Sequence, residues 1–176
     1  YAAMNSPAFT TSVGYWANRI NLGGYNVGVG HATFGNSTNT SYSVAVGFNA
    51  GAAQSDRSVF VGALAGTYGN DNEATLLGHE AGTWGTIVDS VFIGSQAGYL
   101  SSTTNSVFIG REAGYQLQGW DNIAIGRATL YSNPAYPLIT NTIAIGSSVD
   151  TTNSNEVIIG NIHNTIWRTT TSNQVD

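Results

Sequence analysis

The sequence predicts an all-β fold, a parallel β-solenoid of about nine coils with about sixteen residues in each. Three observations predict it. An apolar triplet that ends in glycine recurs along the chain, its spacing stays close to sixteen residues, and small residues stand at fixed offsets after each of these glycines. A helix is excluded, because glycine recurs too often and the apolar pattern lacks a period of 3.6 residues.

The repeat is anchored on the glycine that ends each triplet. Nine anchors follow one another: Gly30, Gly47, Gly62, Gly78, Gly94, Gly110, Gly126, Gly146 and Gly160. The intervals between them are 17, 15, 16, 16, 16, 16, 20 and 14 residues. Only the seventh interval is far from sixteen, and its excess falls within residues 131–140, which we expect to loop out of the wall.

Each triplet is expected to form a short strand. The residues one and three positions before the anchor are aliphatic or β-branched in every copy, from Val27 to Ile159. Because these positions are two residues apart, they share one face of the strand, which we expect to point into the coil. Alanine and glycine follow three and four positions after the anchor, as at Ala97 and Gly98, which predicts a tight turn.

The residue between the two aliphatic positions is apolar in all nine copies as well. Alternation sends it to the opposite face, and a strand that is apolar on both faces is buried on both. The coil interior covers one face only, so the other face predicts an oligomer interface along the rod. The residues expected in this interface are Phe60, Leu76, Phe92 and Phe108. A single wide coil folded over itself is the alternative.

The composition restricts the function. Only 9% of the 176 residues are charged, against roughly 25% in an average soluble domain. The formal net charge of -5 argues against a nucleic-acid partner. No apolar run approaches the roughly 18 residues of a membrane-spanning helix, so we expect no membrane insertion. Cysteine is absent, which excludes disulfides and thiolate chemistry, and the weakly charged surface fits an extracellular location.

We expect no catalytic residue, no metal site and no cofactor. His31, His79 and His163 are too far apart in the sequence for a local ligand cluster, although a threefold axis could gather copies of His31 or His163. The aspartates of the predicted inter-strand loops are interpreted as solubilising or turn residues: Asp56, Asp71, Asp89, Asp121 and Asp150. The protein is therefore expected not to be an enzyme.

Recognition at the surface remains, and aromatic residues are its candidates. The column five residues after the anchor runs Thr67, Thr83, Tyr99, Tyr115 and Tyr131. If it points outward, its tyrosines form a strip that suits sugars and protein receptors, since each ring has an apolar face and a polar tip. Packing on neighbouring coils or at a subunit seam is the alternative. The candidates in loops, where solenoids usually place function, are Trp84, Trp120 and Tyr136.

The segments "NSVFIGREAGY", "DSVFIGSQAGY" and "NIAIGRATL" resemble the head repeats of trimeric autotransporter (YadA-like) adhesins and related repeats of bacteriophage tail fibres. The resemblance covers about residues 23–166. It implies a left-handed β-roll in which three chains lie side by side around one axis. It also implies a homotrimer that binds a glycan or protein receptor on a cell surface, and a location in a virion tail fibre or at a bacterial surface.

Departures from the adhesin pattern favour a virus fibre over a bacterial adhesin head. Phenylalanine recurs in the middle column, where adhesin heads more often carry alanine, and residues 166–176 show no coiled-coil heptads. An ice-binding or purely structural solenoid is a further alternative, suggested by threonine-rich stretches such as residues 101–105. We expect residues 1–22 to be an entry or capping segment, 23–166 the β-roll, and 167–176 a tail or the connection to a removed domain.

Overall fold

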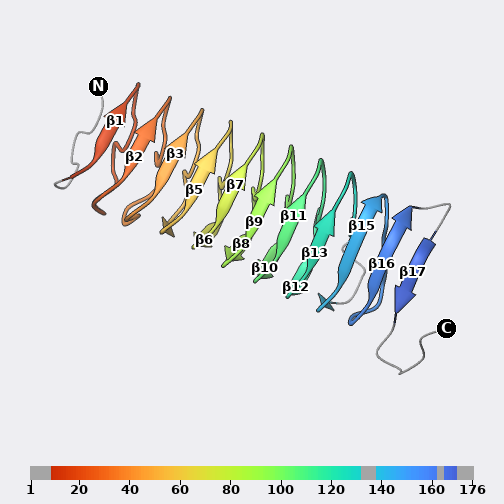
Figure 1. Ribbon diagram of the computed structural model, residues 1–176. Helices are drawn as coiled ribbons and strands as arrows, with labels where there is room; N and C mark the ends of the chain where they lie inside the picture. Colours follow the sequence, from red (N-terminus) through yellow and green to blue (C-terminus); the bar gives the residue numbers. More distant parts are fainter. Residues whose placement is uncertain (1–8, 132–137, 162–164, 170–176) are drawn as a thin grey trace.

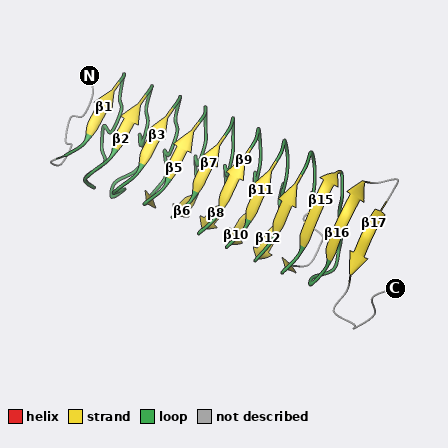
Figure 2. Cartoon of the chain, viewed as in Figure 1, coloured by secondary structure: helices red, strands yellow, loops and turns green. Residues whose placement is uncertain are grey.

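The computed structural model describes residues 9–131, 138–161 and 165–169, and these confirm the parallel β-solenoid predicted from the repeat. The coils lie one against the next in a rod, with β1 at one end and β17 at the other (Figure 1). Short strands alternate with turns throughout the described part of the chain, which contains no helix (Figure 2).

The first sheet collects the apolar triplets. Its eleven strands follow one another in chain order. They are β1 (Thr11–Val13), β2 (Val27–Val29), β3 (Val44–Val46), β5 (Val59–Val61), β7 (Thr75–Leu77), β9 (Val91–Ile93), β11 (Val107–Ile109), β13 (Ile123–Ile125), β15 (Ile143–Ser147), β16 (Val157–Asn161) and β17 (Thr165–Thr169). From β1 to β16 the pairing is parallel and in register, whereas β17 turns back and pairs antiparallel with β16.

The second sheet is formed by the residues that return between triplets. Its six strands pair in parallel. They are β4 (Ser55–Asp56), β6 (Asn70–Asn72), β8 (Thr86–Val88), β10 (Ser102–Thr104), β12 (Gln118–Trp120) and β14 (Ile139–Thr140). The middle residues of β9 in the first sheet and of β8 in the second are both buried. The core therefore lies between the two sheets, and each sheet has one outer face.

The stack begins one coil earlier than the sequence analysis predicted. Gly14 precedes Gly30 by sixteen residues, and the strand before it, β1, pairs in register with β2. The φ of Gly14, 126°, lies in the same region as the φ of Gly30, 137°. The copy was missed because its triplet carries the polar Ser12 in the middle. The segment that was expected to enter or cap the solenoid therefore contains a strand, β1, that stacks on the first sheet.

The structure reverses the two faces predicted for the triplets. The middle residues lie inside the coil, and Phe60, Leu76, Phe92 and Phe108 are each 0% exposed. The flanking aliphatic residues, which were expected inside, point outward, and Ile93 keeps 37% of its surface exposed. The assignment of the four middle residues to an oligomer interface is therefore wrong, because the coil itself buries them.

Matching of side-chain volume explains why the middle residue points inward. A Cβ atom on Gly98 would lie 2.1 Å from the ring of Phe92, so the ring occupies the space that the glycine leaves. Where the triplet instead carries the small Ala124, the residue at the equivalent place in the turn is Leu130, which is buried. In these two coils a large residue at one position is thus matched by a small residue at the other, which keeps the core filled.

A column of buried polar residues precedes the strands of the first sheet and ties the coils together. Ser90, Ser106 and Asn122 occupy it in successive coils. The Ser90 hydroxyl accepts a hydrogen bond from the Ser106 N–H at 3.0 Å, and the Ser106 hydroxyl accepts one from the Asn122 N–H at 3.2 Å. These side chains satisfy buried amides that would otherwise each cost about 1–3 kcal/mol.

Asp71 is a carboxyl group inside the core. It was interpreted as a loop residue in contact with solvent, but it is the middle residue of β6 and only 1% exposed, so that interpretation is wrong. Its neighbours in the inward column are Ser55 and Ile87. Burial raises the pKa of the Asp71 carboxyl well above its usual range, and the nearby backbone of Ile87 offsets this only in part. The fold therefore favours the protonated form.

The substitution Asp71→Asn is expected to stabilise the protein at pH 8. In the unfolded chain this carboxyl ionises near pH 4, whereas in the fold it stays protonated to higher pH, so the wild-type protein loses stability as the pH rises between the two pKa values. Asparagine does not ionise. We expect a gain of about 1–3 kcal/mol at pH 8 that disappears near pH 4. Urea unfolding at both pH values measures it, and a variant no more stable than wild type at pH 8 contradicts it.

Candidate functional site

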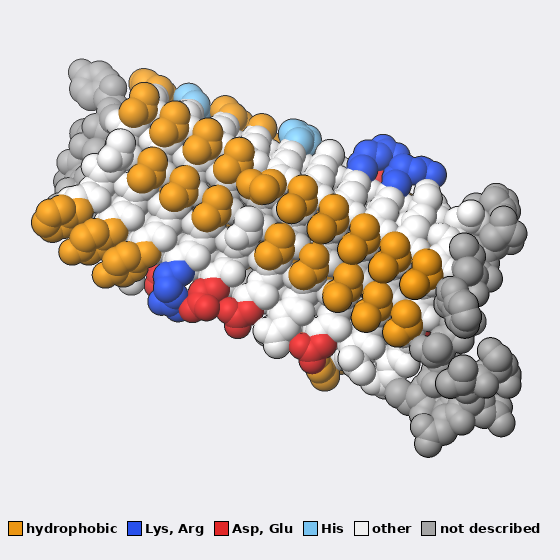
Figure 3. Space-filling model, in the orientation of Figure 1, with side chains coloured by type: hydrophobic (Ala, Val, Ile, Leu, Met, Phe, Trp, Pro, Cys, Tyr) orange, Lys and Arg blue, Asp and Glu red, His pale blue; other side chains and the backbone are white. Residues whose placement is uncertain are grey.

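The outer side of the first sheet is an apolar surface along the rod, which we call the apolar face. It consists of the first and third triplet residues of β2 to β16, which are Val27, Val29, Val44, Val46, Val59, Val61, Thr75, Leu77, Val91, Ile93, Val107, Ile109, Ile123, Ile125, Ile143, Ile145, Val157 and Ile159. Figure 3 shows two rows of hydrophobic side chains along this side. No member is charged, and exposure reaches 39% at Val61. A contiguous apolar surface of this length is typical of a contact site.

The predicted tyrosines form a stacked ladder. The ring centroids of Tyr99 and Tyr115 lie 5.3 Å apart, and those of Tyr115 and Tyr131 lie 4.7 Å apart. The rings stay partly accessible, with Tyr131 at 41%, and partial burial raises the pKa of the Tyr115 hydroxyl. Thr67 and Thr83, from the same predicted column, are buried instead and donate hydrogen bonds to backbone carbonyls at 2.8 and 2.7 Å. The ladder therefore begins at Tyr99.

The tryptophan candidates lie in different places. Trp84 is in the turn between β7 and β8, where its ring stacks on Tyr68 with centroids 4.1 Å apart. Trp120 ends β12 on the outer side of the second sheet and is 49% exposed. Tyr136 lies outside the described residues. The structure thus groups Trp84 with Tyr68 and leaves Trp120 without a stacking partner among the described rings.

Two further aromatic ladders cover the first three coils, and the sequence analysis missed them. They are Phe9, Tyr25 and Tyr42, with centroids 5.2 and 5.0 Å apart, and Tyr15, His31 and Phe48, with centroids 5.5 and 5.1 Å apart. His31, considered above for an ion on a threefold axis, therefore stacks between two rings. Members of each ladder are 16 or 17 residues apart, and this spacing is the signal that would have revealed them.

A row of charged side chains lies at the corner before β5, β7 and β9. Arg57 contacts Glu73, with nitrogen and oxygen 2.7 Å apart, and its hydrogen bond lowers the pKa of Glu73. Glu73 also faces Asp89 and raises the pKa of that carboxyl through a shared hydrogen bond. Coil stacking thus pairs two carboxylates sixteen residues apart, which the sequence analysis did not expect. Both side chains are exposed, so they form a solvated surface pair.

The described surface has hollows at several places, and two of these bring aromatic and polar residues together. One, of about 250 Å³, is lined by Trp16, Arg19, His31 and Phe48, with the Arg19 guanidinium 4.9 Å above the Trp16 ring. The other consists of two adjoining hollows of about 540 and 250 Å³, which we call the groove. The groove runs from Tyr68 and Trp84 at one end to Asp56 and Asn72 at the other.

These surfaces offer noncovalent contacts, namely apolar association along one side and aromatic stacking with hydrogen bonding on others. Among the described residues, no three His, Cys, Asp or Glu side chains are grouped so that they could hold a metal ion. No helix capable of crossing a membrane is found in that part of the chain. Comparison of the sequence and fold with family models, with curated proteins and with solved structures finds no match.

Proposed function

We propose that this chain is a segment of a fibre in which three copies lie side by side, and that the fibre attaches to a receptor on a cell surface. The observation that carries the proposal is the apolar face, which extends from β2 to β16. The resemblance of the repeat to tail-fibre and adhesin-head repeats supplies the number three and the receptor. A virus tail fibre is the first candidate and a bacterial adhesin head the alternative. Catalysis and cofactors have no part in it.

The chemistry of the apolar face supports association with further copies. Burial of apolar surface contributes about 25 cal/mol per Å², and this face presents Val, Ile or Leu in strand after strand. Its backbone groups are already paired within the sheet, so contact with another copy leaves few polar groups without partners. The coil repeat also gives every copy the same spacing along the rod, which allows side chains to interlock coil by coil.

The remaining sides support recognition. The tyrosine ladder and the Tyr68–Trp84 pair lie in the turns that lead from the first sheet to the second, away from the apolar face. Tyrosine and tryptophan supply large contact area with little conformational entropy to lose, and they dominate many binding surfaces. Association through the apolar face would therefore leave these rings accessible to a receptor.

Binding to cells tests the proposal. The sequence contains no lysine, so a fluorophore can be attached selectively to the N-terminal amine. Labelled protein should bind saturably to at least one species in a panel of Gram-negative and Gram-positive bacteria, and unlabelled protein should compete. If the labelled protein binds saturably to none of these species, the proposal is contradicted.

The tyrosine ladder has its own test in the same assay. Replacement of Tyr99, Tyr115 and Tyr131 by Ala is expected to lower the affinity for cells at least tenfold, since aromatic anchors often carry most of the binding free energy. Replacement of Tyr25 and Tyr42, two stacked and exposed tyrosines of another ladder, is the matched control and should leave the affinity unchanged. Equal affinity of the triple variant and the wild type removes the ladder from the binding surface.

A further inference from the structure

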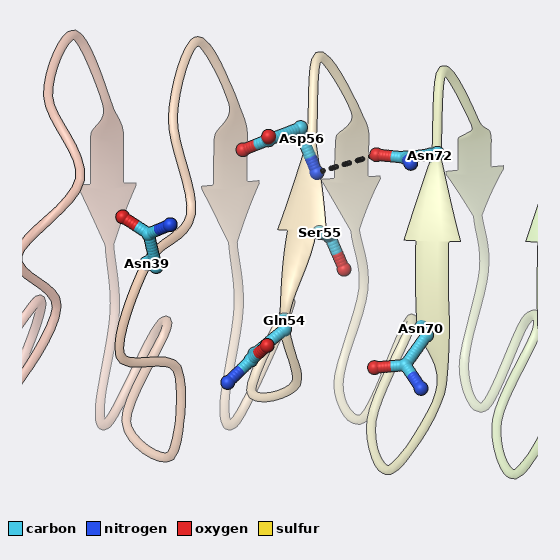
Figure 4. Close-up of a pocket in the computed structure, with 6 residues that line it drawn as sticks. All are labelled: Asn39, Gln54, Ser55, Asp56, Asn70 and Asn72. Atoms are coloured by element: carbon cyan, nitrogen blue, oxygen red, sulfur yellow. Dashed lines mark hydrogen bonds between the residues drawn. The ribbon is translucent and has the colours of Figure 1, made fainter.

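The groove has the composition of a site for a sugar. Its two hollows adjoin one another, since Gln54 and Asn70 line both. One end has aromatic rings, and the other end, over β4 and β6 on the outer side of the second sheet, has amides and a carboxylate (Figure 4). Apolar ring faces beside groups that donate and accept hydrogen bonds match a sugar ring, which has C–H faces and hydroxyls around its edge.

Tyr68 and Trp84 form a platform at the first end. They occupy the same place in successive coils, each with a φ of 65°, and their rings stack at an interplanar angle of 19°. About half of each side chain is exposed, at 53% and 52%. The preceding coil carries Ala52 and Ala53 at this edge, and these small side chains leave the platform open towards the groove. An accessible aromatic face of this kind offers a sugar ring a surface to stack on.

The second end presents oriented amides. The Gln54 side-chain nitrogen donates to the Thr38 hydroxyl at 2.9 Å, which leaves the Gln54 carbonyl oxygen to accept from a ligand. The side-chain oxygen of Asn72 accepts a hydrogen bond from the backbone N–H of Asp56 at 3.2 Å, which leaves the side-chain nitrogen of Asn72 to donate (Figure 4). Asn70 is exposed at the start of β6, two residues before Asn72. Each sugar hydroxyl both donates and accepts hydrogen bonds, so an acceptor at Gln54 and a donor at Asn72 suit neighbouring hydroxyls of a sugar.

The charge of the groove favours a neutral ligand. Among the described residues that line it, Asp56 is the only one that is charged at neutral pH. One Asp56 oxygen accepts a hydrogen bond from the Ser41 N–H at 2.7 Å, which fixes the orientation of the carboxylate. The neighbouring cation, Arg57, is paired with Glu73. An acidic sugar would therefore meet a carboxylate without a compensating cation in the groove.

We propose that the groove binds a neutral glycan, with one sugar ring stacked on the Tyr68–Trp84 platform and the next held by Asn72 and Asp56. The inference rests on the proposed function for the source of the glycan, a cell surface, and not on the number of chains. The groove and the apolar face lie on the outer sides of different sheets, so side-by-side association leaves the groove open.

An array of neutral, sialylated and phosphorylated oligosaccharides provides the probes. The wild-type protein is expected to bind neutral members of the array, and Trp84→Ala is expected to weaken that binding at least tenfold. Trp84→Phe keeps an aromatic face and should lose less. Asn72→Ala alters the other end of the groove and should also weaken binding. Far-UV circular dichroism checks that each variant keeps the β-fold.

Trp16→Ala is the matched control, because Trp16 is an exposed tryptophan outside the groove. It should bind as the wild type does. No binding to the array, binding of charged glycans alone, or a loss with Trp16→Ala but not with Trp84→Ala would each overturn the inference. The proposed function is judged separately: cells that still bind the Trp84→Ala protein support it, and a wild-type protein that binds no cells refutes it.

Discussion

Replacement of Gly94 by alanine is expected to lower the free energy of unfolding by roughly 3 kcal/mol. Gly94 has a φ of 137°, a backbone conformation that residues with a side chain rarely adopt. A Cβ atom there would also lie 2.5 Å from the carbonyl oxygen of Gly110 in the next coil. The contact cannot be relieved locally, because the anchor glycines stack on one another and its relief would require the two coils to separate.

The neighbouring substitution Ser95→Ala is the control, since Ser95 is exposed and carries no such restriction. It should change the stability by less than about 0.5 kcal/mol. Urea unfolding followed by circular dichroism measures both variants at one protein concentration. A Gly94→Ala protein as stable as the control would show that the anchor glycines are not required for the stack.

Two charges on the apolar face are expected to convert the proposed oligomer into a monomer. Val61 and Ile109 lie in β5 and β11, with two strands of the first sheet between them, and both are more than a third exposed in the single chain. Replacement of both by Glu would leave two carboxylates buried without partners in the assembly, which costs several kcal/mol for each. In the single chain the same side chains reach water, so the coil should keep its β-structure.

The control for this pair places the same charges on the other sheet. Thr86 and Gln118 are exposed on the outer side of β8 and β12, and their replacement by Glu should leave the mass of the assembly unchanged. Light scattering after size-exclusion chromatography measures all proteins. An unchanged mass for the Val61→Glu, Ile109→Glu protein would place the contact between copies elsewhere.

The repeat, the strands of the first sheet and the turns could be predicted from the sequence because the anchor spacing reports them directly, whereas the second sheet was not predicted. The direction of the strand faces could not, since Val91, Phe92 and Ile93 are all apolar and alternation alone does not tell inside from outside. The inward direction is indicated by the match in side-chain volume between strand and turn, because the ring of Phe92 fills the space that Gly98 leaves. Only the interior of a coil imposes such a match.

The candidate site was predicted in part, for a related reason. The tyrosine ladder was expected because Tyr99 and Tyr115 share a column of the repeat. The loop residues were considered one loop at a time, so contacts between loops of successive coils were missed. Coil stacking brings together residues about sixteen positions apart, such as Glu73 and Asp89. The groove was not expected at all, because its shape depends on the small side chains of the coil that precedes Tyr68.

The account depends most on the apolar face as a contact between copies. Sedimentation equilibrium of the wild-type protein over a wide range of concentrations tests this directly. We predict a mass three times the 18.4 kDa of one chain, with no change on dilution into the low micromolar range. A mass of 18.4 kDa at every concentration would contradict the account, because the apolar face would then remain in contact with water.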